Sequence, residues 1–281
     1  MTMLEALPLP IFETVLTQLD IQDRWALARV SRAVNSSVLP ILYFNLRIQM
    51  PPWDPLFGIR SFLHHHAEGN AGERLKLVRQ LEFASGLSGG CHRSRLRMVS
   101  HKSYLFSKSL ELSIKPILDG LCVGKLESFV WYFAEIPRGI LDIHGYIPNY
   151  QSGIRSLKLL APGQGFCEQG RHGMFLEGNV DGLVRLKHLK SLSWTSIHSL
   201  RQLRVLSACV KQNAAHLETL ELGFAEHAQV DSAWISCLYD RSAFPNLRKL
   251  SIDRLLFLQT DHESATASAI SLPGLRTQVD H

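Results

Sequence analysis

One phrase of apolar residues recurs along most of the chain, with apolar side chains at its first, fourth and sixth positions. The last two positions alternate with polar residues, which is the period of a β-strand. The starts of the seven copies are 28 to 48 residues apart. We therefore predict seven short strands that present their fourth and sixth residues inward. The copies are Tyr43-Leu46-Ile48, Val78-Leu81-Phe83, Leu126-Phe129-Trp131, Ile154-Leu157-Leu159, Leu189-Leu192-Trp194, Leu217-Leu220-Leu222 and Leu247-Leu250-Ile252.

The stretches between the phrases predict helices, most clearly over 103–119 and 198–213, where apolar residues return at helical spacing. Strand, helix and parallel strand in succession indicate an α/β solenoid with a curved parallel sheet. Residues 161–182 contain six glycines and predict a long loop. Residues 259–271 are polar and small, and the segment that follows aligns Gln278 with Leu250. We expect a frayed C-terminal end or a truncated repeat there.

The first 43 residues follow helical periodicity instead. Pro8 and Pro10 predict an extended entry, so a first helix should begin at about Ile11. Asp20 is the expected N-cap of a second helix. A break at 35–37 should precede a third helix that has Pro40 in its first turn. Three such short helices cannot bury a core alone, so their apolar faces require a partner.

Several positions in this region together resemble an F-box, the module that docks a protein on the Skp adaptor of Skp-cullin-F-box ubiquitin ligases. The resemblance covers about residues 4 to 46, although Pro10 replaces the usual acidic residue and Val34 a frequent Trp. It rests on Leu7-Pro8, Ile11, Leu16, Leu19, Asp23, Leu27, Val30-Ser31-Arg32, Val34 and Leu42-Tyr43. It implies docking on the Skp subunit, and through it a cullin, by Leu7, Pro8, Ile11, Leu16, Leu19, Leu27 and Val30.

The repeated phrase resembles the degenerate leucine-rich repeats that often follow an F-box in fungal proteins, without the asparagine of regular repeats. We expect F-box helices over 1–46 and an irregular leucine-rich-repeat domain over 47–281, with 259–281 weakly ordered or truncated. Tyr43 belongs to both the third helix and the first phrase, so the two parts should join without a flexible linker. The resemblance implies a non-catalytic adaptor whose repeats bind a target protein for ubiquitination. The alternative is a leucine-rich scaffold with no ubiquitin role, whose N-terminal helices only cap the solenoid.

Composition excludes several other classes. No apolar run approaches the roughly 18 residues of a membrane span, and Glu5 and Glu13 interrupt the region where a secretory signal would lie. We therefore expect a protein of the cytoplasm or nucleus, with no membrane partner. The five cysteines are odd in number and form no C-x-x-C pair, which indicates reduced thiols rather than disulfides or a zinc site.

The net charge is +5, and part of it is concentrated in one stretch. Between Glu82 and Glu111 there is no acidic residue. This stretch is either a solvated surface, a site for acidic or phosphorylated cargo, or a nucleic-acid contact. We do not expect nucleic acid to be the partner, because the overall charge excess is modest. The residues of the possible cargo site are Arg93, Arg95, Arg97 and Lys102.

Three motifs suggest chemistry, but each is short. Ser88 lies in a G-x-S-x-G pattern with Asp142 and His144 downstream, yet the surrounding repeat does not predict a hydrolase sheet. Three consecutive histidines at 64–66 do not indicate a metal site, since adjacent side chains rarely point to one metal. We expect them to lie in a solvated loop. The pair of glycines in 163–165 lacks the spacing of a phosphate-binding turn. We predict no enzymatic activity, no cofactor and no metal.

Overall fold

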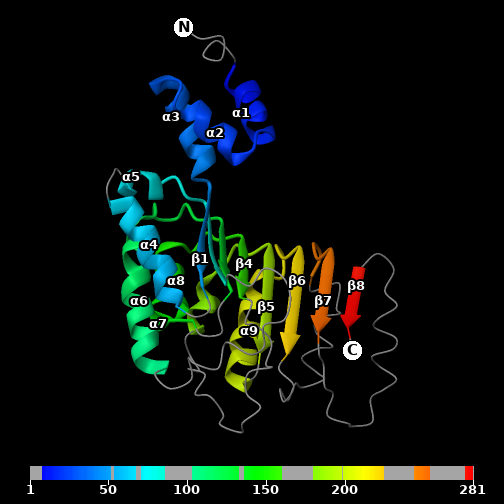
Figure 1. Cartoon of the computed structure of the whole chain (residues 1–281). Coiled ribbons are helices and arrows are strands. Elements are labelled where there is room, and N and C mark those ends of the chain that lie inside the picture. The colour runs from blue at the N-terminus through cyan, green and yellow to red at the C-terminus, as the bar shows by residue number, and fades with distance from the viewer. Residues whose placement is uncertain are drawn as a thin grey trace, which may run out of the picture.

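A computed structural model describes nine stretches of the chain. They are residues 8–51, 54–67, 71–85, 103–132, 136–159, 180–197, 199–224, 244–253 and 276–280. The chain folds into a group of three N-terminal helices followed by a mixed α/β unit (Figure 1).

The N-terminal helices are α1 (Leu9–Gln18), α2 (Ile21–Ala28) and α3 (Arg32–Leu42). The expected start of α1 at Ile11 was wrong by two residues: Pro8 is the N-cap and Pro10 lies in the first turn. Proline is tolerated there because the first N–H groups of a helix have no partner within it. The expected N-cap of α2 is confirmed, since the backbone N–H of Asp23 donates to Oδ1 of Asp20 at 2.8 Å.

The expected break before the third helix was also wrong. Helix α3 is continuous through residues 35–37, and Ser31 is its N-cap, accepting from the backbone N–H of Val34 at 3.2 Å. The polar side chains that suggested a break are bonded locally. Asn35 donates to the carbonyl of Ala28 at 2.7 Å, which ties α3 to the end of α2. Pro40 therefore lies inside the helix rather than in its first turn.

Eight parallel strands form one sheet in strict chain order, joined by seven parallel pairings (Figure 1). Each of the seven predicted phrases supplies one of the first seven strands, which confirms the mixed α/β class and the parallel sheet. The strands are β1 (Asn45–Met50), β2 (Gln80–Ser85), β3 (Ser128–Trp131), β4 (Ser156–Leu159), β5 (Ser191–Ile197), β6 (Thr219–Phe224), β7 (Lys249–Asp253) and β8 (Arg276–Asp280).

The last strand departs from the expected alignment by one residue. Leu250 pairs with Thr277, and Gln278 pairs with Ser251. A slip of one residue exchanges the two faces of a strand, because successive side chains alternate. The proposed equivalence of Gln278 with Leu250 was therefore wrong.

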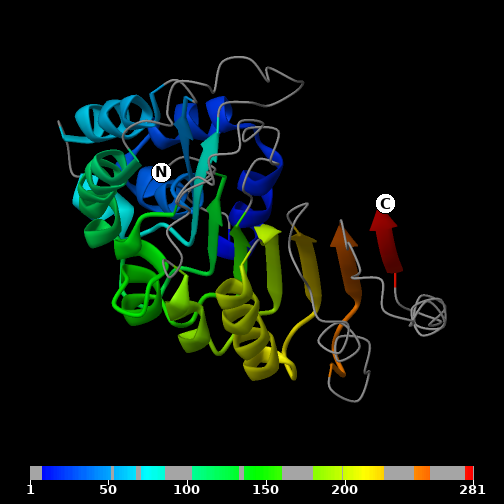
Figure 2. The same cartoon turned by 90° about the horizontal axis from the view of Figure 1, so that it is seen from below.

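The helices of the α/β unit lie on one face of the sheet, and the strands follow an arc in the second view (Figure 2). Two expectations were wrong here: the histidines at 64–66 belong to α4 rather than to a loop, and residues 181 and 182 belong to η3. The predicted helices over 103–119 and 198–213 correspond to α6 and α9. The elements are α4 (Pro55–Ala67), α5 (Ala71–Leu75), α6 (Ser103–Gly120), α7 (Arg138–Leu141), α8 (Tyr146–Tyr150), the 3-10 helix η3 (Asp181–Arg185) and α9 (Leu200–Asn213).

The fourth and sixth residues of the phrases build the core between sheet and helices. Except for the half-buried Leu46, these side chains are buried. Phe83, Phe129 and Trp131 form an aromatic cluster in which the rings of Phe83 and Trp131 are 5.3 Å apart. Burial of such large side chains is the main contribution to the stability of the fold.

Two buried amides connect neighbouring units at the edge where the strands begin. Oδ1 of Asn213 accepts from the backbone N–H of Leu189 at 2.8 Å, and its Nδ2 donates to the carbonyl of Leu186 at 2.7 Å. Gln151 acts in the same way two units earlier, accepting from the N–H of Leu126 at 3.1 Å. These amides satisfy backbone groups that would otherwise be buried without partners.

The three N-terminal helices have a buried cluster of their own, separate from the core of the sheet, so the expectation that they could not bury a core was wrong. The two parts join directly, since Tyr43 caps α3 and β1 begins at Asn45. Arg74 of α5 lies over the ring of Tyr43, with its guanidinium carbon 5.6 Å from the ring centroid. Its Nη1 also donates to the Tyr43 hydroxyl at 3.1 Å. Side-chain contacts thus brace the junction as well as the covalent chain.

Candidate functional site

Apolar side chains are exposed on the first two helices. Ile11 and Val15 lie one turn apart on α1, and Ile21 and Trp25 lie one turn apart on α2. A spacing of four residues places each pair on one face of its helix. Ile11 is 53% exposed, Ile21 is 58% exposed, and Val30, just after α2, is 52% exposed. We call these five residues the apolar rows.

The structure sorts the residues that the sequence assigned to docking. Pro8, Ile11 and Val30 are exposed, whereas Leu19 and Leu27 are half-buried. Leu16 is fully buried in the three-helix cluster, so it packs the helices together rather than facing a partner. Leu7 lies outside the described residues.

Sequence reasoning missed three members of the apolar rows: Val15, Ile21 and Trp25. The signal was present, because α1 carries more apolar positions than one buried stripe requires. Trp25 also contacts the junction, since its ring meets that of Tyr43 edge to face at a centroid distance of 6.1 Å. Trp25 is thereby held against Tyr43, which lies between α3 and β1.

The face of the sheet opposite the helices is polar. Its charged side chains pair across neighbouring strands: Arg47 with Glu82 at 3.1 Å, and Lys249 with Glu221 at 2.5 Å. The hydrogen bond from Lys249 lowers the pKa of Glu221. From β2 to β7 this face carries Gln80, Glu82, Ser128, Val130, Ser156, Lys158, Ser191, Ser193, Thr219, Glu221, Lys249 and Ser251.

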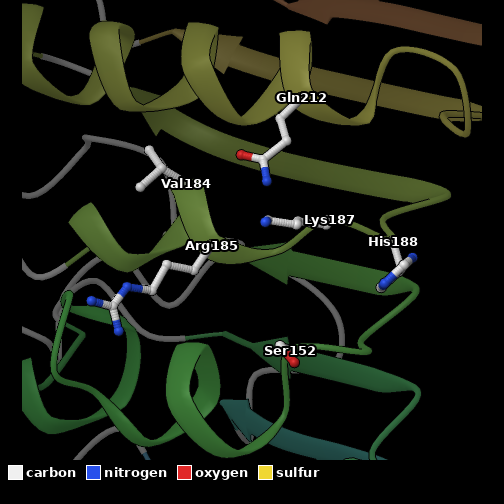
Figure 3. A pocket seen from close by; sticks show the side chains of 6 residues that line it. All are labelled: Ser152, Val184, Arg185, Lys187, His188 and Gln212. Atoms are coloured by element: carbon white, nitrogen blue, oxygen red, sulfur yellow. The ribbon is translucent and has the colours of Figure 1, made fainter.

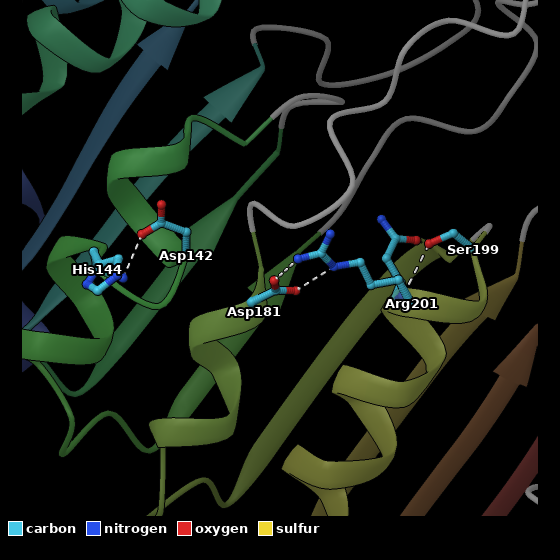
Figure 4. A network of polar contacts seen from close by, with 6 residues as sticks. Asp142, His144, Asp181, Ser199 and Arg201 are labelled. Carbon is cyan, nitrogen blue, oxygen red and sulfur yellow. Dashed lines mark hydrogen bonds and ion pairs between the residues drawn. The ribbon is translucent and has the colours of Figure 1, made fainter.

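A polar network lies near the N-terminus of α9 (Figure 4). Arg201 of α9 pairs with Asp181 of η3, with Nε 3.3 Å from Oδ1 and a second contact through Nη2. Ser199 caps α9 by accepting from the backbone N–H of Gln202 at 3.2 Å. These contacts hold η3 against α9.

The residues considered for a hydrolase do not form a relay in the described structure. Asp142 accepts from the backbone N–H of His144 at 2.9 Å, which is a local turn contact rather than a bond to the imidazole (Figure 4). Ser88 lies outside the described residues, as do the glycines at 163–165.

A shallow hollow of about 640 Å³ lies where β4 and β5 begin, between the turn before β4 and the C-terminal end of α9 (Figure 3). Gln212 of α9 points toward Lys187, which lies centrally, while Arg185 and His188 extend to opposite sides. The lining residues are Ser152, Val184, Arg185, Lys187, His188 and Gln212. The charged groups of the lining are therefore all basic.

The remaining predicted sites give no further geometry. Arg93, Arg95, Arg97 and Lys102 lie outside the described residues. His64 and His65 are exposed on α4, and within the described ranges no three His, Cys, Asp or Glu side chains form a group suited to a metal ion.

The two cysteines in the described structure, Cys122 and Cys209, are free thiols. Burial raises the pKa of Cys209 to about 12, so its thiol is protonated at neutral pH and unsuited to act as a nucleophile.

A scan against protein-family models and a search of curated proteins each found no match to this chain. None of the helices in the described stretches has both the length and the apolar character needed to cross a bilayer. The site that the geometry offers most clearly is a pair of exposed apolar rows on a three-helix unit braced against a sheet.

Proposed function

We propose that this chain is the substrate-recognition adaptor of a Skp-cullin-F-box ubiquitin ligase. Its three N-terminal helices act as an F-box that docks on the Skp subunit and through it on a cullin. The sheet unit acts as an irregular leucine-rich-repeat solenoid that binds the target protein. The observation that carries this proposal is the exposure of the apolar rows on helices that already have a filled core.

The rows have the chemistry of a docking surface. Large apolar side chains held in place on helices are what an apolar partner groove accommodates. Each is about half exposed, so burying the remainder against a partner would contribute about 1 kcal/mol per side chain. The burial of all five side chains together would favour specific association with a partner. The isolated chain lacks this stabilisation, because the side chains are exposed to water.

The second part of the proposal rests on the architecture. Parallel strands in strict chain order, separated by helices on one face, have the form of stacked strand-helix repeats, each in contact with its neighbours. The braced junction at Tyr43 and Arg74 holds this unit in a fixed relation to the docking helices. A bound target would thus stay at a fixed distance from the ligase.

The adaptor itself performs no chemistry in this scheme, because the ligase-bound conjugating enzyme transfers ubiquitin to the target. Such complexes act in the cytoplasm and nucleus, which is where we place this protein. It requires no cofactor for this role.

A capture experiment with the purified Skp adaptor tests the proposal. Full-length wild type should retain the adaptor, whereas Ile11→Asp combined with Ile21→Asp should lose it, because two charges would face an apolar groove. Leu112→Asp is the matched control, since Leu112 is 59% exposed on α6, away from the rows. Circular dichroism should show that all three proteins are folded. Failure of folded wild type to retain the adaptor would favour the leucine-rich scaffold with no ubiquitin role.

A further inference from the structure

The edge of the sheet where the strands begin carries an excess of positive charge. Five of the segments that lead into a strand at this edge contain the cations Lys125, Arg155, Lys187, Lys190 and Arg248. They contain two carboxylates, Glu127 and Glu218. These segments are 121–127, 151–155, 186–190, 214–218 and 244–248.

Most of this charge is not neutralised within the described structure. Glu218 is paired with Lys190 at 2.7 Å, which leaves the other cations of the edge in excess. Backbone hydrogen bonds hold these positions in a row, since the N–H of Lys190 donates to the carbonyl of Arg155 and that of Glu218 to the carbonyl of Lys190. Successive positions are therefore about 4.8 Å apart, the separation of neighbouring strands.

The hollow between η3 and α9 lies at this edge and is lined by two cations, Arg185 and Lys187 (Figure 3). Nη1 of Arg185 donates to Oδ1 of Asn149 at 2.6 Å, a neutral amide that fixes the guanidinium without cancelling its charge. Asn149 is itself held by a hydrogen bond of 2.8 Å to the carbonyl of Gly145. Lys187 takes part in none of the ion pairs found in the described part of the chain.

The helix ends nearby account for only part of the charge. Lys211 lies in the last turn of α9, where a cation offsets the negative end of the helix dipole. Lys187 lies after η3, which has only five residues, so its charge does not offset the dipole of a long helix. Gln212 and Ser152 add uncharged hydrogen-bonding groups on two sides of it.

We propose that this hollow and the adjoining edge bind an extended acidic peptide. Carboxylate side chains of such a peptide would meet Arg185 and Lys187, while Gln212 and Ser152 would bond its backbone. The lining of the hollow contains no Phe, Tyr or Trp ring on which bases could stack. The observations therefore favour a peptide over RNA or DNA.

This inference deepens the proposed function by naming the class of target. The role of the peptide as a target rests on that function, whereas the binding itself requires no Skp adaptor. The two can be separated, because Ile11 and Ile21 lie on the N-terminal helices and the hollow lies between η3 and α9.

Fluorescence anisotropy of a labelled peptide of alternating Glu and Gly residues tests the inference with the full chain. Wild type should bind with an affinity that falls as NaCl is raised. Arg185→Glu combined with Lys187→Glu should weaken binding by at least about tenfold. Arg60→Glu makes the same kind of charge change on α4 and should leave binding within about twofold. Lys187→Glu alone, at an exposed side chain, provides a variant that preserves the Arg185–Asn149 bond and should also weaken binding.

Several outcomes would overturn the inference: no binding by folded wild type at low salt, equal loss in Arg60→Glu, or wild-type affinity in both hollow variants. Tighter binding of a single-stranded oligonucleotide that the hollow variants abolish would assign the site to nucleic acid instead. The hollow variants should still retain the Skp adaptor, and Ile11→Asp with Ile21→Asp should still bind the peptide. Failure of Skp capture alone would therefore reject the adaptor role and leave the peptide site intact.

Discussion

Replacement of Asn213 by Leu should destabilise the fold more than any surface change of similar size. The Asn213 side chain is fully buried and bonds the N–H of Leu189 and the carbonyl of Leu186 in the preceding unit. Leucine has a similar volume but no hydrogen-bonding groups. The substitution therefore isolates the effect of the two backbone groups left without a partner.

The expected magnitude follows from those two groups. A buried polar group without a partner costs about 1–3 kcal/mol, so the loss should be about 2–6 kcal/mol. This is a large share of the roughly 5–15 kcal/mol by which natural domains are stable. Asn246→Leu is the matched control, because its Nδ2 also donates to a carbonyl, that of Ala215 at 2.7 Å, but at an exposed position where water can replace it. We expect that control to lose less than about 1 kcal/mol.

Urea unfolding followed by circular dichroism measures both variants. The midpoint for Asn213→Leu should fall well below that of wild type, with an unchanged slope, and Asn246→Leu should remain close to wild type. Equal midpoints for the two variants would refute the reasoning. Such a result would mean that the buried amide does not satisfy otherwise unpaired groups between the units.

Three further predictions concern the interior and the open face. Trp131→Ala should lower the stability by about 3–5 kcal/mol, measured by urea unfolding, and a loss below about 1 kcal/mol would contradict the packing of the aromatic cluster. Iodoacetamide at pH 8 should modify Cys122 before Cys209 in the folded chain, since the raised pKa keeps the Cys209 thiol protonated; peptide mapping showing the reverse order would contradict its burial. The lowered pKa of Glu221 gives stability that is present above its usual 4.5 and is lost as the pH falls through the folded value. Because the Lys249 side chain is about half exposed, Glu221→Gln should reduce the change in unfolding free energy between pH 7 and pH 3 by only a few tenths of a kcal/mol relative to wild type. Urea unfolding at both pH values measures this, and a larger reduction would contradict a pair at the surface.

The strands were predictable because their signal is local and repeated. The fourth and sixth residues of each phrase must face one core, so alternation identifies a strand such as β4 from six residues alone. The same argument failed at β8, where Thr277 and Val279 follow the phrase less clearly and the register differs by one residue.

The helix boundaries depended on contacts that the sequence does not display. Residues 35–37 read as a break, because Asn and Ser compete with helical hydrogen bonds. In the fold, Asn35 instead bonds the end of α2, which turns a helix-breaking residue into a tertiary contact. The histidines at 64–66 were misassigned to a loop although they belong to α4, where His64 and His65 are exposed.

The two candidate surfaces differ in how far the sequence could predict them. The excess of apolar residues in α1 and α2 predicts a docking surface from the sequence. The packing of the three helices is needed to show that Leu16 is buried and Ile11 is exposed. The basic hollow had no local signal. Ser152, Lys187 and Gln212 are far apart in the chain, and the parallel stacking of the strands brings them together.

Hydrogen–deuterium exchange of the full chain, alone and with the purified Skp adaptor, tests the central claim most directly. The account predicts a stable complex in which slower exchange is concentrated in α1, α2 and the residues up to Val30, while the strands of the sheet exchange as in the free chain. Absence of a complex, or protection confined to the sheet unit, would contradict docking through the apolar rows and the assignment of the N-terminal helices as an F-box.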